Sequence, residues 1–187
     1  VHIVKGDDIG VKLSVNALKN GYLVGIPTET VYGLAADASN LMAVRKIYEV
    51  KQRPLSNPLI VHISSLNQIY EWATDIPKYA LDFANSFWPG PLTLILKRNK
   101  QVSDLITANQ DSVAVRIPRL PITQSLLEEL LRVGIYGLAA PSANVYGYVS
   151  PTTALDVFEG LNAKLSENDL ILDGGVCEIG IESTIVD

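Results

Sequence analysis

Residues 22–34 read YLVGIPTETVYGL, and the change of character within this stretch decides the fold. Residues 22–26 form an apolar run that is typical of a buried strand. Residues 27–34 then bring polar side chains, a proline and a glycine, as expected where a strand is followed by a loop that carries functional groups. The stretch therefore predicts a strand that delivers side chains to a site.

Two other segments have the same build. The polar stretch KQRPLSNP at 51–58 comes directly before the apolar run 59–63, and apolar residues 138–140 lead directly into PSAN at 141–144. Because each of the three polar segments adjoins a predicted strand, we expect them to line one composite pocket.

The rest of the chain alternates helical and strand patterns. Apolar residues at helical spacing predict helices over 9–18, 41–48, 76–87, 120–131 and 150–158, the last with Ser150 as its N-cap. Apolar runs predict strands over 22–26, 59–63, 92–97, 113–117, 135–140, 169–172 and 184–186. These elements predict an α/β or α+β fold with helices packed on a largely covered sheet.

Length and composition favour one domain over residues 1–187. The chain is 48% hydrophobic and shows no repeat or polar linker. Its longest apolar runs end well short of the roughly 18 residues that a membrane span needs, and its first residues do not read as a signal peptide. We expect a soluble, cytoplasmic protein with no membrane partner. Cys177 is the only cysteine, which excludes an internal disulfide and a cysteine metal cluster.

The charge pattern favours a small anionic ligand. A net charge of -5 argues against broad electrostatic binding of nucleic acid. The cations are instead local, with Arg45, Lys46, Lys51 and Arg53 close together in the sequence.

A family resemblance covers the chain from about residue 23 to residue 187. It rests on seven segments in order: PTETVYGL, KQRPLSNPLIVH, FWPGPLTLIL, SVAVRIP, APSAN, VSPT and IESTIVD. Together they resemble the YrdC-type threonylcarbamoyl-AMP synthases. The resemblance implies a twisted mixed β-sheet with flanking helices and a concave ligand-binding face. It also implies a nucleotidyltransferase that makes L-threonylcarbamoyl-AMP from L-threonine, bicarbonate and ATP, releasing pyrophosphate, for the threonylcarbamoyl-adenosine of tRNA.

Lys51 and Arg53 are the predicted catalytic residues. They end a predicted helix just before Pro54, and their charges suit a triphosphate whose pyrophosphate leaves. A solvated helix end is the alternative. The resemblance implies the full ATP-binding set: Lys51, Arg53, Asn57, Ser112, Ser142, Asn144 and Ser150. The composition of PSAN is equally compatible with an ordinary turn, and a helix cap would explain Ser150.

Arg116 is the predicted cation for the threonine carboxylate. A charge in the apolar run 113–117 would be costly without a ligand or partner, and a structural ion pair with a buried acid is the competing explanation. The resemblance implies the L-threonine-binding set Thr30, His62, Arg116, Ala140 and Ser183. Taken alone, Thr30 is compatible with a turn residue, Ser183 with a strand hydroxyl and His62 with a core histidine.

Glu29 and Tyr32 are second-rank candidates. The acid is expected to orient Lys51 or to hold magnesium indirectly, and the tyrosine to pack on the substrate or on the sheet. No carboxylate or histidine cluster predicts a metal site, so Mg2+ is expected to arrive on ATP.

The resemblance also implies partners: tRNA or double-stranded RNA, and the downstream threonylcarbamoyl transferase proteins. The alternatives are a double-stranded RNA-binding or tRNA-binding module, a carbamate-adenylating role, and an inactive paralogue. Relatives in this family continue past the TIVD segment into a strand whose arginine contacts ATP. If nothing followed Asp187, weaker nucleotide binding would be expected.

Overall fold

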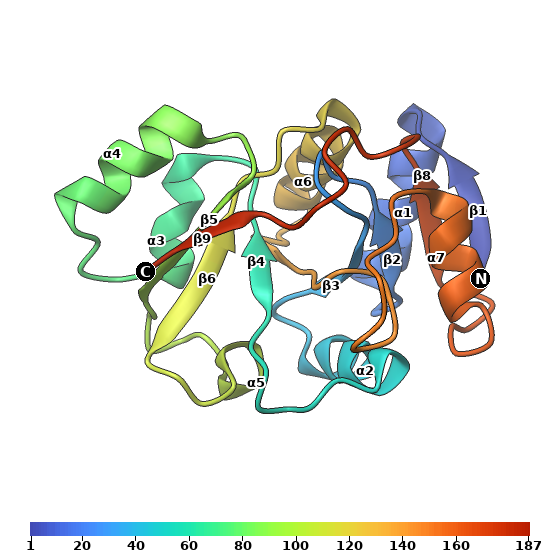
Figure 1. Cartoon of the computed structure of the whole chain (residues 1–187), viewed down its shortest axis with the longest axis horizontal. Helices are drawn as coiled ribbons and strands as arrows, with labels where there is room; N and C mark the ends of the chain where they lie inside the picture. Colours follow the sequence, from blue (N-terminus) through green and yellow to red (C-terminus); the bar gives the residue numbers. More distant parts are fainter.

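A nine-stranded mixed sheet forms the centre of the protein, in a computed structural model that describes residues 1–187. The strand order is β1-β8-β2-β3-β7-β4-β6-β5-β9 (Figure 1). The strands are β1 (His2–Lys5), β2 (Val24–Ile26), β3 (Gly33–Asp37), β4 (Ile60–His62), β5 (Leu92–Lys97), β6 (Ser112–Arg116), β7 (Leu138–Ala139), β8 (Leu170–Asp173) and β9 (Thr184–Val186). The pairs β1–β8, β2–β8, β4–β6 and β5–β9 are parallel, and the others are antiparallel. The predicted mixed sheet with flanking helices is confirmed.

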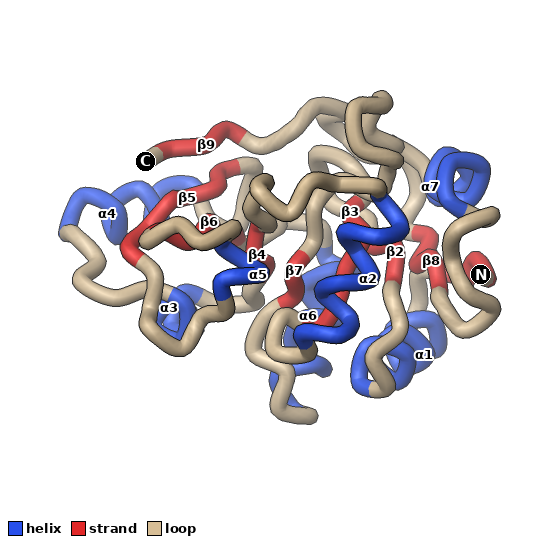
Figure 2. The backbone as a smooth tube through the Cα atoms, turned by 90° about the horizontal axis from the view of Figure 1, so that it is seen from below, coloured by secondary structure: helices blue, strands red, loops and turns tan.

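Helices cover both faces of this sheet. They are α1 (Asp8–Lys19), α2 (Leu41–Lys51), the 3-10 turn η1 (Leu66–Gln68), α3 (Ile69–Trp72), α4 (Lys78–Phe87), α5 (Asp104–Thr107), α6 (Pro121–Arg132) and α7 (Ala154–Leu161). A core cluster of 13 buried residues joins α1 and α6 to the sheet, and a cluster of 32 joins it to α2, α4 and α7. In Figure 2, β2 and β8 run between α7 above and α1 below. Burial of both faces explains why most strands read as continuous apolar runs.

Two strands and three short helical elements were missed. Strand β1 is a four-residue edge strand, and β3, GLAAD, consists largely of glycine and alanine, which have low strand propensity. The elements η1, α3 and α5 are too short, at three or four residues, to show a helical period. The predicted strand 135–140 is reduced to β7, two residues long.

The predicted cap of the fifth helix was wrong. Helix α7 begins at Ala154, with Thr153 as its N-cap. The Thr153 hydroxyl accepts from the backbone N–H of Asp156, and the Asp156 carboxylate accepts from the backbone N–H of Thr153. This reciprocal capping box stabilises the start of the helix three residues later than predicted and leaves Ser150 available for other contacts.

Candidate active site

A cavity of about 180 Å³ opens where several strands end. All five residues of the predicted L-threonine set line it: Thr30, His62, Arg116, Ala140 and Ser183. They come from the β2–β3 loop, the ends of β4 and β6, the residue after β7 and the residue before β9. The fold therefore brings together side chains from five separate parts of the chain.

Arg116 is the buried cation of this cavity, and only 4% of the residue is exposed. Its Nη2 lies 2.6 Å from Oε1 of Glu29, its Nη1 donates to Oγ1 of Thr30 at 2.9 Å, and its Nε donates to the carbonyl of Gly90 at 3.2 Å. The buried ion pair weighed as the competing explanation is thus present. A guanidinium has five N–H groups, so these three contacts leave two for a ligand.

Glu29 holds Arg116, so of the two roles expected for it the contact with Lys51 is not formed. Its second oxygen accepts the backbone N–H of Arg119 at 2.9 Å, and the carboxylate is fully buried. Removing either partner of such a pair would leave a buried charge uncompensated.

Tyr32 packs within the fold and lines neither this cavity nor the larger one described below. Its hydroxyl donates to the carbonyl of Gly175 at 2.8 Å and accepts the N–H of Gly174 at 3.2 Å. Burial raises the pKa of this phenol well above its usual value. Of the two roles expected for Tyr32, packing in the protein fits this geometry.

His62 faces the smaller cavity as a neutral imidazole. Its burial, and secondarily the nearby charge of Arg116, lowers the pKa of the ring to about 3. Its Nδ1 is buried and has no hydrogen-bond partner. A buried polar atom without a partner at a cavity wall is a natural contact for a polar ligand.

Thr93 supports this wall through its contact with Ser183 and was missed by the sequence reasoning. Its hydroxyl lies 2.7 Å from that of Ser183, and the residue is fully buried in β5. A lone threonine in the apolar run Leu92-Thr93-Leu94 was the signal that could have identified it.

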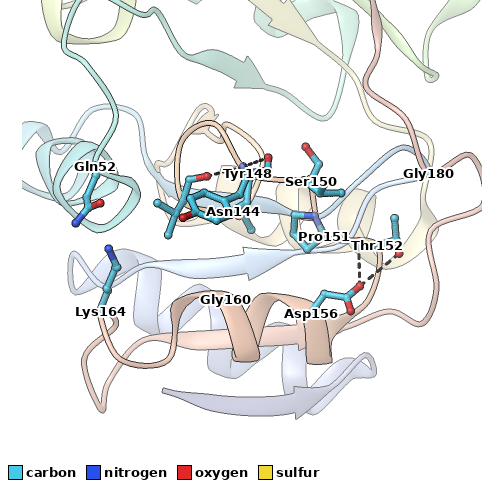
Figure 3. Close-up of a pocket in the computed structure, with 13 residues that line it drawn as sticks. Gln52, Asn144, Tyr148, Ser150, Pro151, Thr152, Asp156, Gly160, Lys164 and Gly180 are labelled. Atoms are coloured by element: carbon cyan, nitrogen blue, oxygen red, sulfur yellow. Dashed lines mark hydrogen bonds between the residues drawn. The ribbon is translucent and has the colours of Figure 1, made fainter.

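A second, larger cavity of about 800 Å³ lies beside the first. Its lining, drawn in Figure 3, includes Gln52, Asn144, Tyr148, Ser150 and Lys164. The PSAN segment lies between the two cavities. Ser142 lines the smaller cavity, and the next residue, Ala143, lines the larger. A hydrogen bond between Ser150 and Glu182 also joins their walls. The two adjacent cavities could therefore hold two substrates of one reaction.

The predicted ATP set is only partly brought together. Asn144 and Ser150 line the larger cavity, and Arg53 and Ser142 line the smaller. Ser112 lies at the opposite end of β6 from Arg116 and lines a separate cavity. The structure therefore does not bring Ser112 to the other candidates.

Lys51 is buried, so the alternative of a solvated helix end is wrong for it. Its ammonium donates to the carbonyls of Ser142 and Asn144, and its own carbonyl accepts the N–H of Tyr146. Helix α2 ends here because Gln52 adopts a left-handed conformation, with φ of 52°. Burial, and secondarily Arg53, lowers the pKa of Lys51 to about 7. Lys51 fastens α2 to the loop that separates the two cavities.

Arg53 reaches the smaller cavity from the turn after α2. Its guanidinium donates to the carbonyls of Asn57 and Pro58, and it lies 5.6 Å from the ring centre of Tyr146. The side chain of Asn57 donates to the hydroxyl of Tyr146 at 2.6 Å. Hydrogen bonds within the polar segment 51–58 thus fix its conformation, and its bonds to the 141–148 loop fix the position of that loop.

Residues 174–183, which we call the strap, close the site from one side. In Figure 1 the strap is red and runs from β8 towards β9 in front of the sheet. The N–H groups of Ile179 and Gly180 donate to the carbonyls of Glu29 and Thr30. These bonds place Glu182 and Ser183 on the wall of the smaller cavity.

Two further features bear on ligands and location. The chain has no group of three or more His, Cys, Asp or Glu residues placed to hold a metal ion. None of its helices is long and apolar enough to span a membrane.

Comparison with known proteins identifies relatives across most of the chain. Residues 16–187 match the Sua5–YciO–YrdC family model, whose description is "Telomere recombination". The chain is 45% identical over 177 residues to a threonylcarbamoyl-AMP synthase of Pyrococcus abyssi, covering 95% of this chain and 50% of that protein. It is 44% identical over 170 residues to the Bacillus subtilis protein of the same name, covering 90% of this chain and 47% of the relative. The chain thus spans about half the length of these relatives.

Solved structures give the same relationship. Sua5 from P. abyssi in complex with L-threonine superimposes with a TM-score of 0.90 at 43% identity, covering all of this chain and 54% of that one. YciO from Escherichia coli superimposes with a TM-score of 0.84 at 21% identity, covering 100% and 88%, and shows the shared fold.

Proposed function

Because this chain belongs to the Sua5–YciO–YrdC family, we propose that it forms L-threonylcarbamoyl-AMP from L-threonine, bicarbonate and ATP, with release of pyrophosphate. The observation that carries the proposal is the smaller cavity, lined by all five residues of the predicted L-threonine set together with Arg53. Its relatives named as threonylcarbamoyl-AMP synthases, and the Sua5 structure that holds L-threonine, support the same activity.

In this proposal the smaller cavity holds the amino acid and the larger holds part of the nucleotide. Two N–H groups of Arg116 remain for the carboxylate of L-threonine. The amine and bicarbonate form N-carboxythreonine with loss of water. Its new carboxylate then attacks the α-phosphate, and pyrophosphate leaves. The protein contributes position and charge, which dominate catalysis when a phosphoryl group is attacked.

Lys51 and Arg53 would neutralise the charge that develops on the leaving pyrophosphate. Arg53 already lines the smaller cavity, whereas Lys51 must exchange its carbonyl partners for phosphate oxygens. Mg2+ would enter with ATP, held mainly by phosphate oxygens and water. The product would serve tRNA modification through a downstream threonylcarbamoyl transferase protein, in the cytoplasm.

The decisive experiment measures pyrophosphate release while L-threonine and bicarbonate are omitted in turn. Release should require both, and Arg116→Ala should reduce it at least about a hundredfold, as for loss of a charged group that positions substrate. Arg98→Ala is the matched control, because Arg98 also bonds a carboxylate, a carbonyl and a threonine hydroxyl but lies outside both cavities. Binding of double-stranded RNA without any pyrophosphate release would contradict the synthase proposal.

A further inference from the structure

We propose that Glu182 binds the α-ammonium group of the amino acid substrate and so holds its amine where the two cavities meet. The inference rests on the proposed function, because it takes L-threonine to occupy the smaller cavity. It supplies a contact for the one charged group of L-threonine that Arg116 cannot bind, since a guanidinium has no acceptor.

The carboxylate of Glu182 lies at the junction of the two cavities. The residue belongs to the strap and lines the smaller cavity, whereas Ser150, whose hydroxyl donates to Oε1 of Glu182, lines the larger. The strap is fixed close by, because the N–H of Gly180 donates to the carbonyl of Thr30 at 3.0 Å. A carboxylate can accept about four hydrogen bonds, and Ser150 provides the only one that Glu182 accepts within the protein. Its second oxygen is therefore free for a ligand.

The charges of the smaller cavity match a zwitterion. Glu182 is the only acidic residue on its wall, where Arg53 and Arg116 are the cations and His62 is neutral. Glu29 is bonded to Arg116 and lines neither cavity. An amino acid with its carboxylate at Arg116 and its ammonium at Glu182 thus meets an opposite charge at both groups.

The proposed reaction requires the amine to be at this junction. Its nitrogen is the atom on which the new carboxylate forms, and that carboxylate must then reach the α-phosphate of a nucleotide in the larger cavity. Because the Glu182 carboxylate is bonded to a residue of the larger cavity, an ammonium held by it faces the nucleotide. Glu182 is therefore a substrate-binding residue that also orients the reacting atom.

Magnesium is the other cation that could approach Glu182, since it would arrive with ATP. The smaller cavity favours the amino acid. Its volume of about 180 Å³ is below the roughly 300 Å³ from which pockets for larger ligands start, and two arginines on its wall would repel a dication. The two sources of positive charge are separated by measuring the binding of L-threonine without ATP and Mg2+.

Calorimetric titration under these conditions tests the contact. Glu182→Gln keeps the size of the side chain and an oxygen that can accept from Ser150, but it removes the charge. It should raise the Kd of L-threonine about tenfold or more, because a charge-assisted hydrogen bond is lost. Glu178→Gln is the matched control: Glu178 is also an exposed acid of the strap, bonded once, to Arg119, but it lines neither cavity. It should change the Kd less than about twofold.

A ligand without the amine identifies the group that Glu182 binds. (R)-3-hydroxybutyrate keeps the carboxylate and the hydroxyl of L-threonine, and competition measured by NMR detects its weaker binding. Glu182→Gln should change its Kd less than about twofold. Equal weakening of both ligands, or an effect on L-threonine no larger than that of Glu178→Gln, would refute the assignment. Weaker binding of ATP with Mg2+ by Glu182→Gln, with L-threonine binding unchanged, would also overturn it, in favour of the metal.

A crystal structure of the unaltered protein with L-threonine decides the geometry directly. The amine nitrogen should lie within about 3.2 Å of a Glu182 carboxylate oxygen. A nitrogen bonded only to neutral groups, such as His62 or backbone carbonyls, would overturn the inference while leaving the proposed function intact. Failure of the unaltered protein to bind L-threonine at all would instead count against the proposed function.

Discussion

His62 combines complete burial with a ring nitrogen that has no partner in the ligand-free protein. Folding lowers the pKa of His62 from 6.5 to about 3. Between these two pH values, the ring is neutral in the folded protein and protonated in the unfolded chain. Below about pH 6.5 the unfolded state therefore binds more protons, and stability falls as the pH falls towards 3.

We expect His62→Leu to reduce this loss of stability in acid. Between pH 6.5 and 4.5, the free energy of unfolding of the unaltered protein should fall by up to about 1.4 kcal/mol per pH unit more than that of the variant. Urea unfolding followed by circular dichroism at several pH values measures the difference. His2→Leu is the control, because His2 is exposed on the edge strand β1. Parallel pH profiles for the unaltered protein and His62→Leu would contradict the prediction.

At the residue scale, the sequence predicted which side chains gather but not what they contact. The five residues that the family resemblance implied for L-threonine do line one cavity. The partner of Arg116 could not be identified, since Glu29 lies 87 positions away in the chain. Thr28, which also lines the smaller cavity, passed unnoticed because a hydroxyl that binds its own turn looks the same in sequence as any other turn residue.

At the scale of elements, the end of α2 and the loop 141–148 act as one unit joined through Lys51. The pKa of Lys51 is lowered from 10.5 to about 7, so the unfolded chain holds a proton between those values that the folded protein has released. Stability linked to this group therefore rises with pH across that window and is constant below it.

We expect Lys51→Met to remove this dependence. Between pH 7 and pH 10, the free energy of unfolding of the unaltered protein should rise by up to about 1.4 kcal/mol per pH unit more than that of the variant. Lys46→Met is the control, since Lys46 lies on the same helix and bonds only the carbonyl of Gly21. Denaturant unfolding across this pH range measures it, and a constant difference between the unaltered protein and Lys51→Met would show that Lys51 keeps its usual pKa.

Element prediction succeeded where a pattern was long and failed where it was short. Helices such as α1 and α6, each 12 residues long, have clear apolar faces and were found within a residue or two at each end. Strand β3 was missed because its glycine and alanines fill a crowded sheet centre and carry no strand preference of their own. Its pairing with β2 and β7 decides its conformation, and pairing depends on distant parts of the chain.

For the whole molecule, we propose that residues 1–187 unfold as one cooperative domain. The sheet is continuous, and neighbouring residues of β7 belong to different core clusters, Leu138 to the smaller and Ala139 to the larger. Loss of one cluster would therefore expose the sheet that supports the other.

Coincident unfolding curves are the expected result. Trp72 and Trp88 both pack against the larger core cluster, so their fluorescence reports that side, whereas far-ultraviolet circular dichroism also reports α1 and α6. A variant with Tyr22→Trp, in which Trp72 and Trp88 are both replaced, has a single tryptophan. Its fluorescence reports the smaller cluster, against which Tyr22 packs. Within the unaltered protein and within the variant, the fluorescence and circular dichroism transitions in urea should share one midpoint. Separate midpoints would show two independently unfolding units.

Strand order was the part of the architecture that the sequence left open. Local patterns locate strands, but which strands pair depends on all of them together. Here the first strand pairs with the eighth, and β4 lies between β7 and β6.

The pairing of β1 with β8 has a consequence for synthesis on the ribosome. His2 is made long before its ladder partner Leu170. Strand β1 must therefore wait, with its backbone unpaired, until β8 has been made. The smaller cavity is delayed in the same way, because Ser183, part of its wall, is made later still. Until β8 is made, the unpaired backbone of β1 is open to chaperones that shield unpaired strands.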